Sequence, residues 1–148
     1  MFYTQKSTRM NNIRFTEHFS LIEFERSETA KKYKLDNTAS PLAKDNLKDL
    51  CDNILEPARR RLGMPIIVTS GFRSAEVNRR VGGALNSMHL TGRAADIYCS
   101  DNERLLEILK QMPCYELIVY RYKQSGRINR FHVSYNGGRK GSWFSKYI

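Results

Sequence analysis

Cysteine is scarce in this chain, and the few cysteines present exclude two kinds of stabilising site. The 148 residues include three cysteines, Cys51, Cys99 and Cys114, an odd number without paired spacing. Such a set indicates neither a disulfide framework nor a cysteine-based zinc motif. We therefore expect buried or free thiols in a reducing compartment.

Long apolar runs are absent as well. The first residues, MFYTQKSTRMNNIRFTEHFS, lack the apolar centre of a signal peptide. No apolar run of about 18 residues, the length that a membrane span needs, occurs anywhere in the chain. We therefore expect a protein made in the cytoplasm without an export signal and without a membrane span. Its action on a cell wall would then follow its release, or its transport in a virion.

Acidic residues are outnumbered, with 15 Asp and Glu against 25 Lys and Arg, which gives a formal net charge of +10. Such a surface favours anionic partners, among them nucleic acids, anionic membranes and anionic cell-wall polymers. The basic residues are spread over most of the chain, as on a solvated surface. Length and an apolar content of 41% predict one globular domain over residues 1–148, with residues 1–15 loosely held, and we expect a monomer.

Helical periodicity is clearest in residues 42–62, where apolar side chains recur at spacings of three and four. Pro57 predicts a kink or a break within this helix, and Gly63 predicts its end. An apolar stripe predicts another helix over residues 20–35, with Glu23 as the capping-box partner of Ser20. Two shorter helices are expected at residues 74–80 and 102–112.

Short β-branched and aromatic segments predict the strands, at residues 65–70, 93–98, 116–120 and 131–135. The last two are separated by a basic turn, which favours an antiparallel pair. Paired glycines predict a loop over residues 81–92, and residues 136–148 are expected to form a turn and a tail.

Three polar residues form a candidate metal site. His89 and Asp96 lie seven residues apart on either side of Gly92, which lets the chain turn and bring both side chains to one point. His132 alternates with apolar neighbours and points away from them. Two imidazoles and a carboxylate can hold a catalytic zinc and leave one position open. Ordinary polar residues are the competing interpretation, because H-x₆-D is no general zinc pattern. His18 is expected at the surface or at a helix start.

Taken together, these motifs resemble the zinc D-alanyl-D-alanine carboxypeptidase family, which shares its fold with the zinc domain of hedgehog proteins. The resemblance covers roughly residues 15–136 and is strongest to small single-domain members from bacteria and phages. It rests on residues 70–74 (SGFRS), Asn78, residues 81–83 (VGG), the S-x-H-x-x-G-x-A-x-D run of residues 87–96, and residues 132–134 (HVS).

The resemblance implies an α+β fold, with a small antiparallel sheet and flanking helices. It also implies zinc held by His89, Asp96 and His132, with water as the fourth ligand. Arg73 matches the family arginine that faces the substrate, where a guanidinium pairs with a carboxylate or stabilises an oxyanion. Ser87 matches a residue that lines the same pocket.

One position departs from the family pattern. Members of the family place a glutamate, the general base, on the strand before the second histidine, and an ungapped alignment puts Tyr120 there. Tyrosine, with a pKa near 10, is a poor base at neutral pH, but it can donate a hydrogen bond to an oxyanion. Glu116 lies on the same strand face, about 13 Å away along the strand, so it could serve only if the register or a bulge shifts.

Three functions are therefore open. The first is a zinc-dependent peptidase that cuts peptidoglycan stem peptides, as a carboxypeptidase or endopeptidase in a phage or bacterial lytic role. The second is a zinc-binding module that lost its activity and serves as a wall-binding or virion structural protein, suggested by Tyr120. The third is nucleic-acid binding, which only the charge and the Tyr and Arg content favour, without a known motif.

Overall fold

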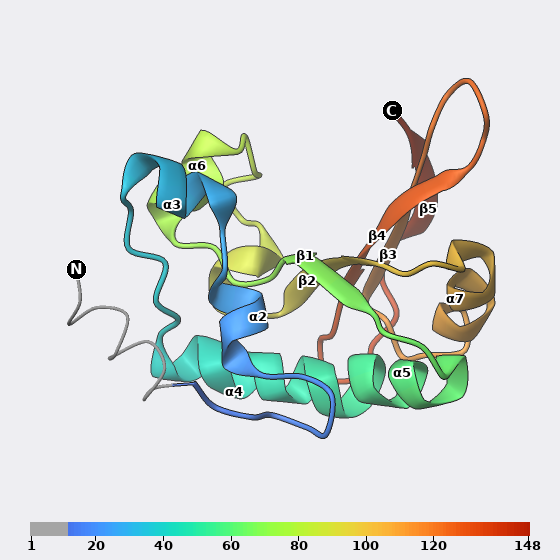
Figure 1. Ribbon diagram of the computed structural model, residues 1–148, viewed down its shortest axis with the longest axis horizontal. Coiled ribbons are helices and arrows are strands. Elements are labelled where there is room, and N and C mark those ends of the chain that lie inside the picture. The colour runs from blue at the N-terminus through green and yellow to red at the C-terminus, as the bar shows by residue number, and fades with distance from the viewer. Residues whose placement is uncertain (1–11) are drawn as a thin grey trace.

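The computed structural model describes residues 12–148, and its secondary structure forms an α+β fold (Figure 1). The helices pack around one mixed sheet, whose strand order is β1-β2-β4-β3-β5. In chain order the elements are α2 (Leu21–Glu25), α3 (Glu28–Tyr33), α4 (Pro41–Leu50), η1 (Cys51–Leu55), α5 (Glu56–Leu62), β1 (Ile67–Ser70), α6 (Ala75–Arg80), η2 (Met88–Thr91), β2 (Ala94–Tyr98), α7 (Asn102–Leu109), β3 (Glu116–Arg121), β4 (Ile128–Ser134) and β5 (Trp143–Tyr147).

Alternation along the strands divides the sheet into an apolar face and a polar face. Leu117 and Val119 on β3 and Phe131 and Val133 on β4 are buried and belong to the same core cluster as the apolar side chains of α4, η1, α5 and α7. The intervening residues of both strands point to the other face, over which the segment from α6 to η2 passes. The core therefore fixes, by its period of two, which side chains reach the site.

The long helix predicted over residues 42–62 is present, but it is not a regular α-helix. It begins at Pro41 with Ser40 as N-cap, passes through the π-helical turn η1, and continues as α5 to Leu62. Pro57 explains the π turn, since its ring clashes with the carbonyl four residues before it and it has no N–H to donate. Gly63 ends the helix with a positive φ of 74°, as predicted.

The prediction of one continuous helix over residues 20–35 is wrong, because two short helices, α2 and α3, occupy this range. The chain leaves helical conformation at Arg26, and Ser27 then caps α3 by accepting a hydrogen bond from the Ala30 N–H. The prediction of a loose segment over residues 1–15 lies mostly outside the described residues. Its described end is held, because Phe15 is 7% exposed and belongs to the core.

The sheet is larger than the four predicted strands. β4 begins at Ile128, within the predicted turn, and the predicted tail contains a strand, β5, that pairs with β3 in parallel. All other pairings are antiparallel, including the predicted pair of β3 and β4. The expectation of a wholly antiparallel sheet is thus corrected at this edge. Among residues 12–148, no helix has the length and apolar character that crossing a membrane requires.

The three cysteines are unpaired and buried, as the sequence predicts. Burial raises the pKa of the Cys51 thiol, and it raises the pKa of Cys114 to about 12. Both thiols are therefore protonated at neutral pH and act as small apolar groups in the core.

Candidate metal centre

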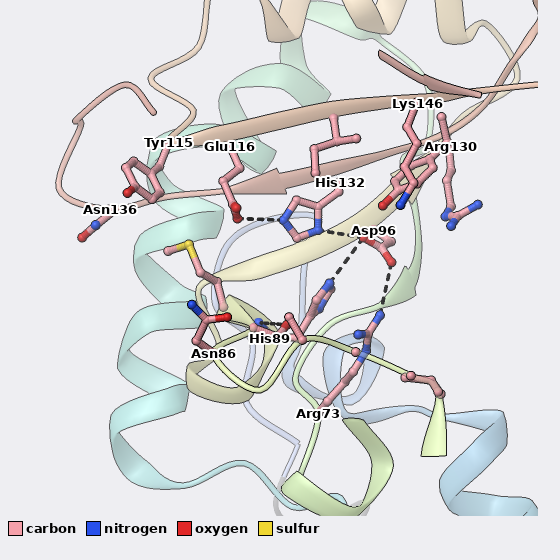
Figure 2. Close-up of a pocket in the computed structure, with 18 residues that line it drawn as sticks. Arg73, Asn86, His89, Asp96, Tyr115, Glu116, Arg130, His132, Asn136 and Lys146 are labelled. Carbon is pink, nitrogen blue, oxygen red and sulfur yellow. Dashed lines mark hydrogen bonds and ion pairs between the residues drawn. The ribbon is translucent and has the colours of Figure 1, made fainter. Parts of the chain in front are cut away.

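The polar face of the sheet brings two of the three predicted ligands directly together. Asp96 on β2 and His132 on β4 are partners in the antiparallel register. The Asp96 Oδ1 atom lies 3.1 Å from His132 Nδ1 (Figure 2). Phe131 and Val133 on either side of His132 are fully buried, which confirms that the histidine points away from its apolar neighbours.

His89 reaches the same point from η2, a single 3-10 turn where a loop was expected. Ser87 caps this turn, since its hydroxyl accepts the His89 N–H. The His89 Nδ1 atom lies 2.7 Å from the Gly71 carbonyl oxygen, which can only accept, so Nδ1 carries the ring proton. The Nε2 atom therefore presents its lone pair, and it lies 3.4 Å from Asp96 Oδ1.

Gly92 ends the turn, and two of its properties explain why glycine stands there. Its φ is 74°, and a Cβ atom would lie 2.4 Å from the backbone oxygen of Ala43. Without a glycine, the chain between His89 and Asp96 could not pass this close to α4.

We expect Gly92→Ala to lower the free energy of unfolding by more than the roughly 1–2 kcal/mol that a left-handed backbone costs a non-glycine residue. Gly63→Ala is the matched control, because Gly63 has the same φ of 74° with no atom within 4 Å of its Cβ position. Urea unfolding of both variants measures the difference. An equal loss at the two positions would contradict the close approach of Gly92 to Ala43.

The ligand atoms of His89, Asp96 and His132 all lie within 4.8 Å of one another. Tetrahedral zinc with bonds of about 2.0–2.2 Å places its ligands roughly 3.3–3.6 Å apart. The separations of 3.1 and 3.4 Å from Asp96 Oδ1 to the two imidazole nitrogens suit that geometry. The residues present therefore fit a zinc ion with one open coordination position.

Hydrogen bonds among these groups also set their charges. Burial alone would raise the pKa of Asp96, but its contacts with His132 and His89 outweigh that effect and lower it. Burial alone would lower the pKa of His132, but its contacts with Asp96 and Glu116 raise it to about 9. His132 is then protonated in the metal-free protein at neutral pH, so a metal must displace that proton.

Glu116 belongs to this centre, although distance along the strand argued against it. On β3 it is paired with Ser134, and its Oε1 atom lies 2.9 Å from His132 Nε2 and 3.1 Å from Ser134 Oγ. The expectation that it needs a register shift is wrong. Glu116 reaches the centre through His132 on the adjacent strand, so its distance from Tyr120 along β3 does not matter. The hydrogen bond from His132 lowers the pKa of Glu116, which stays ionised.

Arg73 lies on the opposite side of the cluster from Glu116 (Figure 2). Its Nη2 atom lies 3.4 Å from Asp96 Oδ2, and its other nitrogens donate to Ser70 Oγ at 3.0 Å and Asn78 Oδ1 at 3.3 Å. These partners hold the guanidinium beside the candidate ligands.

A cleft of about 680 Å³ opens over the cluster. Ser87, Tyr120 and Glu116 line it, as do Arg130 and Lys146. Burial and the nearby Asp96 raise the pKa of Tyr120, so its hydroxyl keeps its proton and is a donor at neutral pH. A basic phenolate at this position is thereby excluded.

Arg130 and Lys146 were not predicted from the sequence. Arg130 stands two residues before His132, so alternation along a longer strand would have placed it on the same face. Lys146 gave no such signal, since β5 itself was not expected.

A second group of possible ligands, Glu17, His18 and Glu56, lies at the start of α5. His18 Nδ1 is 2.6 Å from Glu56 Oε2, and Arg60 contacts both Glu56 and Glu17. Burial opposes ionisation of Glu56, but hydrogen bonds from the side chain and the backbone N–H of His18 lower its pKa to about 2. The guanidinium of Arg60 already balances these carboxylates, so the group is an ion-pair network that ties the N-terminal segment to the helix.

A buried His–Asp–His cluster that opens into a cleft is the arrangement of a metal centre with a free coordination position. The sequence profile of the Peptidase M15 family matches residues 17–129, a range that includes His89, Asp96, Glu116 and Tyr120 and ends before His132. This chain belongs to the peptidase M15 family.

The chain also resembles a curated protein over part of its length. A stretch of 44 residues is 50% identical to the zinc D-Ala-D-Ala carboxypeptidase of Streptomyces albus G. That stretch covers 29% of this chain and 17% of the relative. The remaining length of the relative has no counterpart in this match.

Proposed function

We propose that this protein is a zinc-dependent peptidase of the D-Ala-D-Ala carboxypeptidase type that acts on peptidoglycan stem peptides. One observation carries the proposal. The lone pair of His89 Nε2, the Asp96 carboxylate and the His132 Nδ1 atom converge, at separations that suit tetrahedral zinc, on the floor of a cleft. Family membership and the partial likeness to a zinc carboxypeptidase support it.

Zinc in this centre would supply a Lewis acid for the peptide carbonyl and for the attacking water. The side chains around it have complementary tasks. The ionised Glu116, whose Oε1 is anchored by His132 and Ser134, accepts the proton of that water through its other oxygen. The protonated hydroxyl of Tyr120 and the guanidinium of Arg73 stabilise the negative charge that develops on the carbonyl oxygen.

The test is cleavage by the zinc-loaded protein of a peptide that ends in D-Ala-D-Ala, and of purified peptidoglycan, with the products followed by mass spectrometry. We expect release of the terminal D-Ala, or of a stem-peptide fragment, that stops when a chelator removes zinc and resumes when zinc is restored. Cleavage that continues after removal of the metal would contradict a zinc mechanism.

An alternative within the same family is a zinc-binding module without peptidase activity. Tyr120 supports it, because the resemblance places a glutamate there. Stoichiometric zinc without cleavage, followed by a gain of cleavage in Tyr120→Glu, would establish this alternative. We expect the wild type to cleave the peptide, because Glu116 lies beside His132 and can act as the base in place of the glutamate that the family has at position 120.

The place of action is part of the proposal. A net charge of +10 suits an anionic cell wall. We infer action on the wall by a phage or bacterial lytic enzyme that reaches it after release or within a virion. Lysis of cells to which the purified protein is added from outside, compared with lysis by a zinc-free sample, tests this role.

A further inference from the structure

Two cations flank one tyrosine on the polar face of the sheet. Tyr120 on β3 is paired with Arg130 on β4 and with Lys146 on β5, so the three residues form one row across adjacent strands. All three line the cleft over the metal centre. Figure 2 shows Arg130 and Lys146 together on the Asp96 side of His132, away from Glu116.

The charges of this pair are not balanced by the protein. Among residues 12–148, neither Arg130 nor Lys146 lies within ion-pair distance of a carboxylate. Arg73, in contrast, pairs with Asp96. Arg130 and Lys146 belong to the two strands that flank β3, so an anion bound between their side chains would be stabilised by both charges.

Arg130 is also held in one orientation. Its guanidinium lies over the Tyr120 ring at 4.1 Å, and its Nη1 atom donates to Asn129 Oδ1 at 2.7 Å. Both partners are neutral, so the positive charge is kept while the planar fork is fixed. A fixed guanidinium edge beside a lysine suits the two oxygens of a carboxylate.

The row lies at a defined distance from the metal centre. Arg130 precedes His132 by two residues on the same strand, a separation of about 7 Å along β4. An extended peptide covers that distance in about two residues. We propose that Arg130 and Lys146 form a subsite for a second carboxylate of the peptide substrate, about two residues from the bond that is cleaved.

This inference rests on the peptidase function proposed above, but binding can be measured without cleavage. The probes are pentapeptides ending in D-Ala-D-Ala, with a glutamate at the third or fourth position from the C-terminus, each compared with its glutamine counterpart. Isothermal titration to the zinc-loaded protein, with catalysis stopped by Glu116→Gln, gives the dissociation constants. We expect one glutamate peptide to bind on the order of tenfold more tightly than its glutamine partner, as two partly exposed ion pairs would provide.

That preference should disappear in Arg130→Gln/Lys146→Gln and persist in Lys123→Gln, which removes a charge from the exposed turn between β3 and β4. Circular dichroism and zinc content confirm that the variants are folded. A preference of equal size in the double variant would overturn the subsite, as would the lack of any preference between the paired peptides. A preference that the double variant removes, in a protein whose wild type cleaves nothing, would uphold the subsite and refute the peptidase.

Discussion

Replacing His89 with alanine is expected to abolish zinc binding and, with it, peptide cleavage. His89 is 2% exposed, and the Gly71 carbonyl fixes its tautomer so that Nε2 faces Asp96 and His132. Loss of a hydrogen-bonding partner behind a zinc ligand already costs about 10–100-fold in affinity, so loss of the ligand itself should exceed 100-fold. Competition with a coloured chelator measures the zinc affinity, and mass spectrometry measures the cleavage.

His18→Ala is the matched control for this substitution. It removes the remaining histidine, whose partners are Glu56 and the ion-pair network around it, and no group of the cleft. We expect His18→Ala to keep one zinc per chain and to keep cleavage, while its free energy of unfolding falls. If His89→Ala kept zinc and His18→Ala lost it, the metal site would be the group of Glu17, His18 and Glu56, and the proposed site would be wrong.

Glu116→Gln is expected to lower kcat by about 10²–10⁴-fold, the usual contribution of a general base, with zinc content unchanged. Glutamine keeps the side-chain length and an oxygen that can accept the His132 Nε2–H, so His132 remains oriented. It removes only the charge and the basicity of the carboxylate. Tyr120→Phe should lower kcat by about 10²–10³-fold, because it deletes a single donor to the oxyanion.

Glu107→Gln controls for the loss of a negative charge, since among residues 12–148 Glu107 forms an ion pair only with Lys110, on the exposed side of α7. It should leave kcat unchanged. If Glu116→Gln cleaved at the wild-type rate while Glu116→Ala lost zinc affinity, the task of Glu116 would be to orient His132, and the proton acceptor would have to be another group.

The sequence predicted the grouping of His89, Asp96 and His132 better than the residues around them. His89 and Asp96 belong to one short segment, and His132 to a strand with a clear apolar alternation, so local patterns place all three. Glu116 was misjudged because its distance was measured along β3 from Tyr120. Its actual neighbour belongs to β4, and the register between strands cannot be read from one strand.

The edge strand β5 was not predicted from the sequence, for a different reason. Most residues of β5 are exposed on both faces, so they lack the alternation that identifies a half-buried strand. Because β5 was not predicted, nothing in the sequence indicated that Lys146 lines the cleft. The π turn before Pro57 keeps the apolar spacing of a helix, so the periodicity of the sequence does not reveal it. Pro57 alone predicts that the helix is interrupted there.

Asp96 and His132 are held by a hydrogen bond to each other, His89 is held by one to the Gly71 carbonyl, and the strands rest on a core of apolar side chains. Loading with the ion is therefore separable from folding, in contrast to small domains that collapse only around zinc. A sample treated with a chelator should remain folded and should bind other divalent ions at the same site. Cobalt could then serve as a coloured reporter, whose spectrum would register each molecule that enters the cleft.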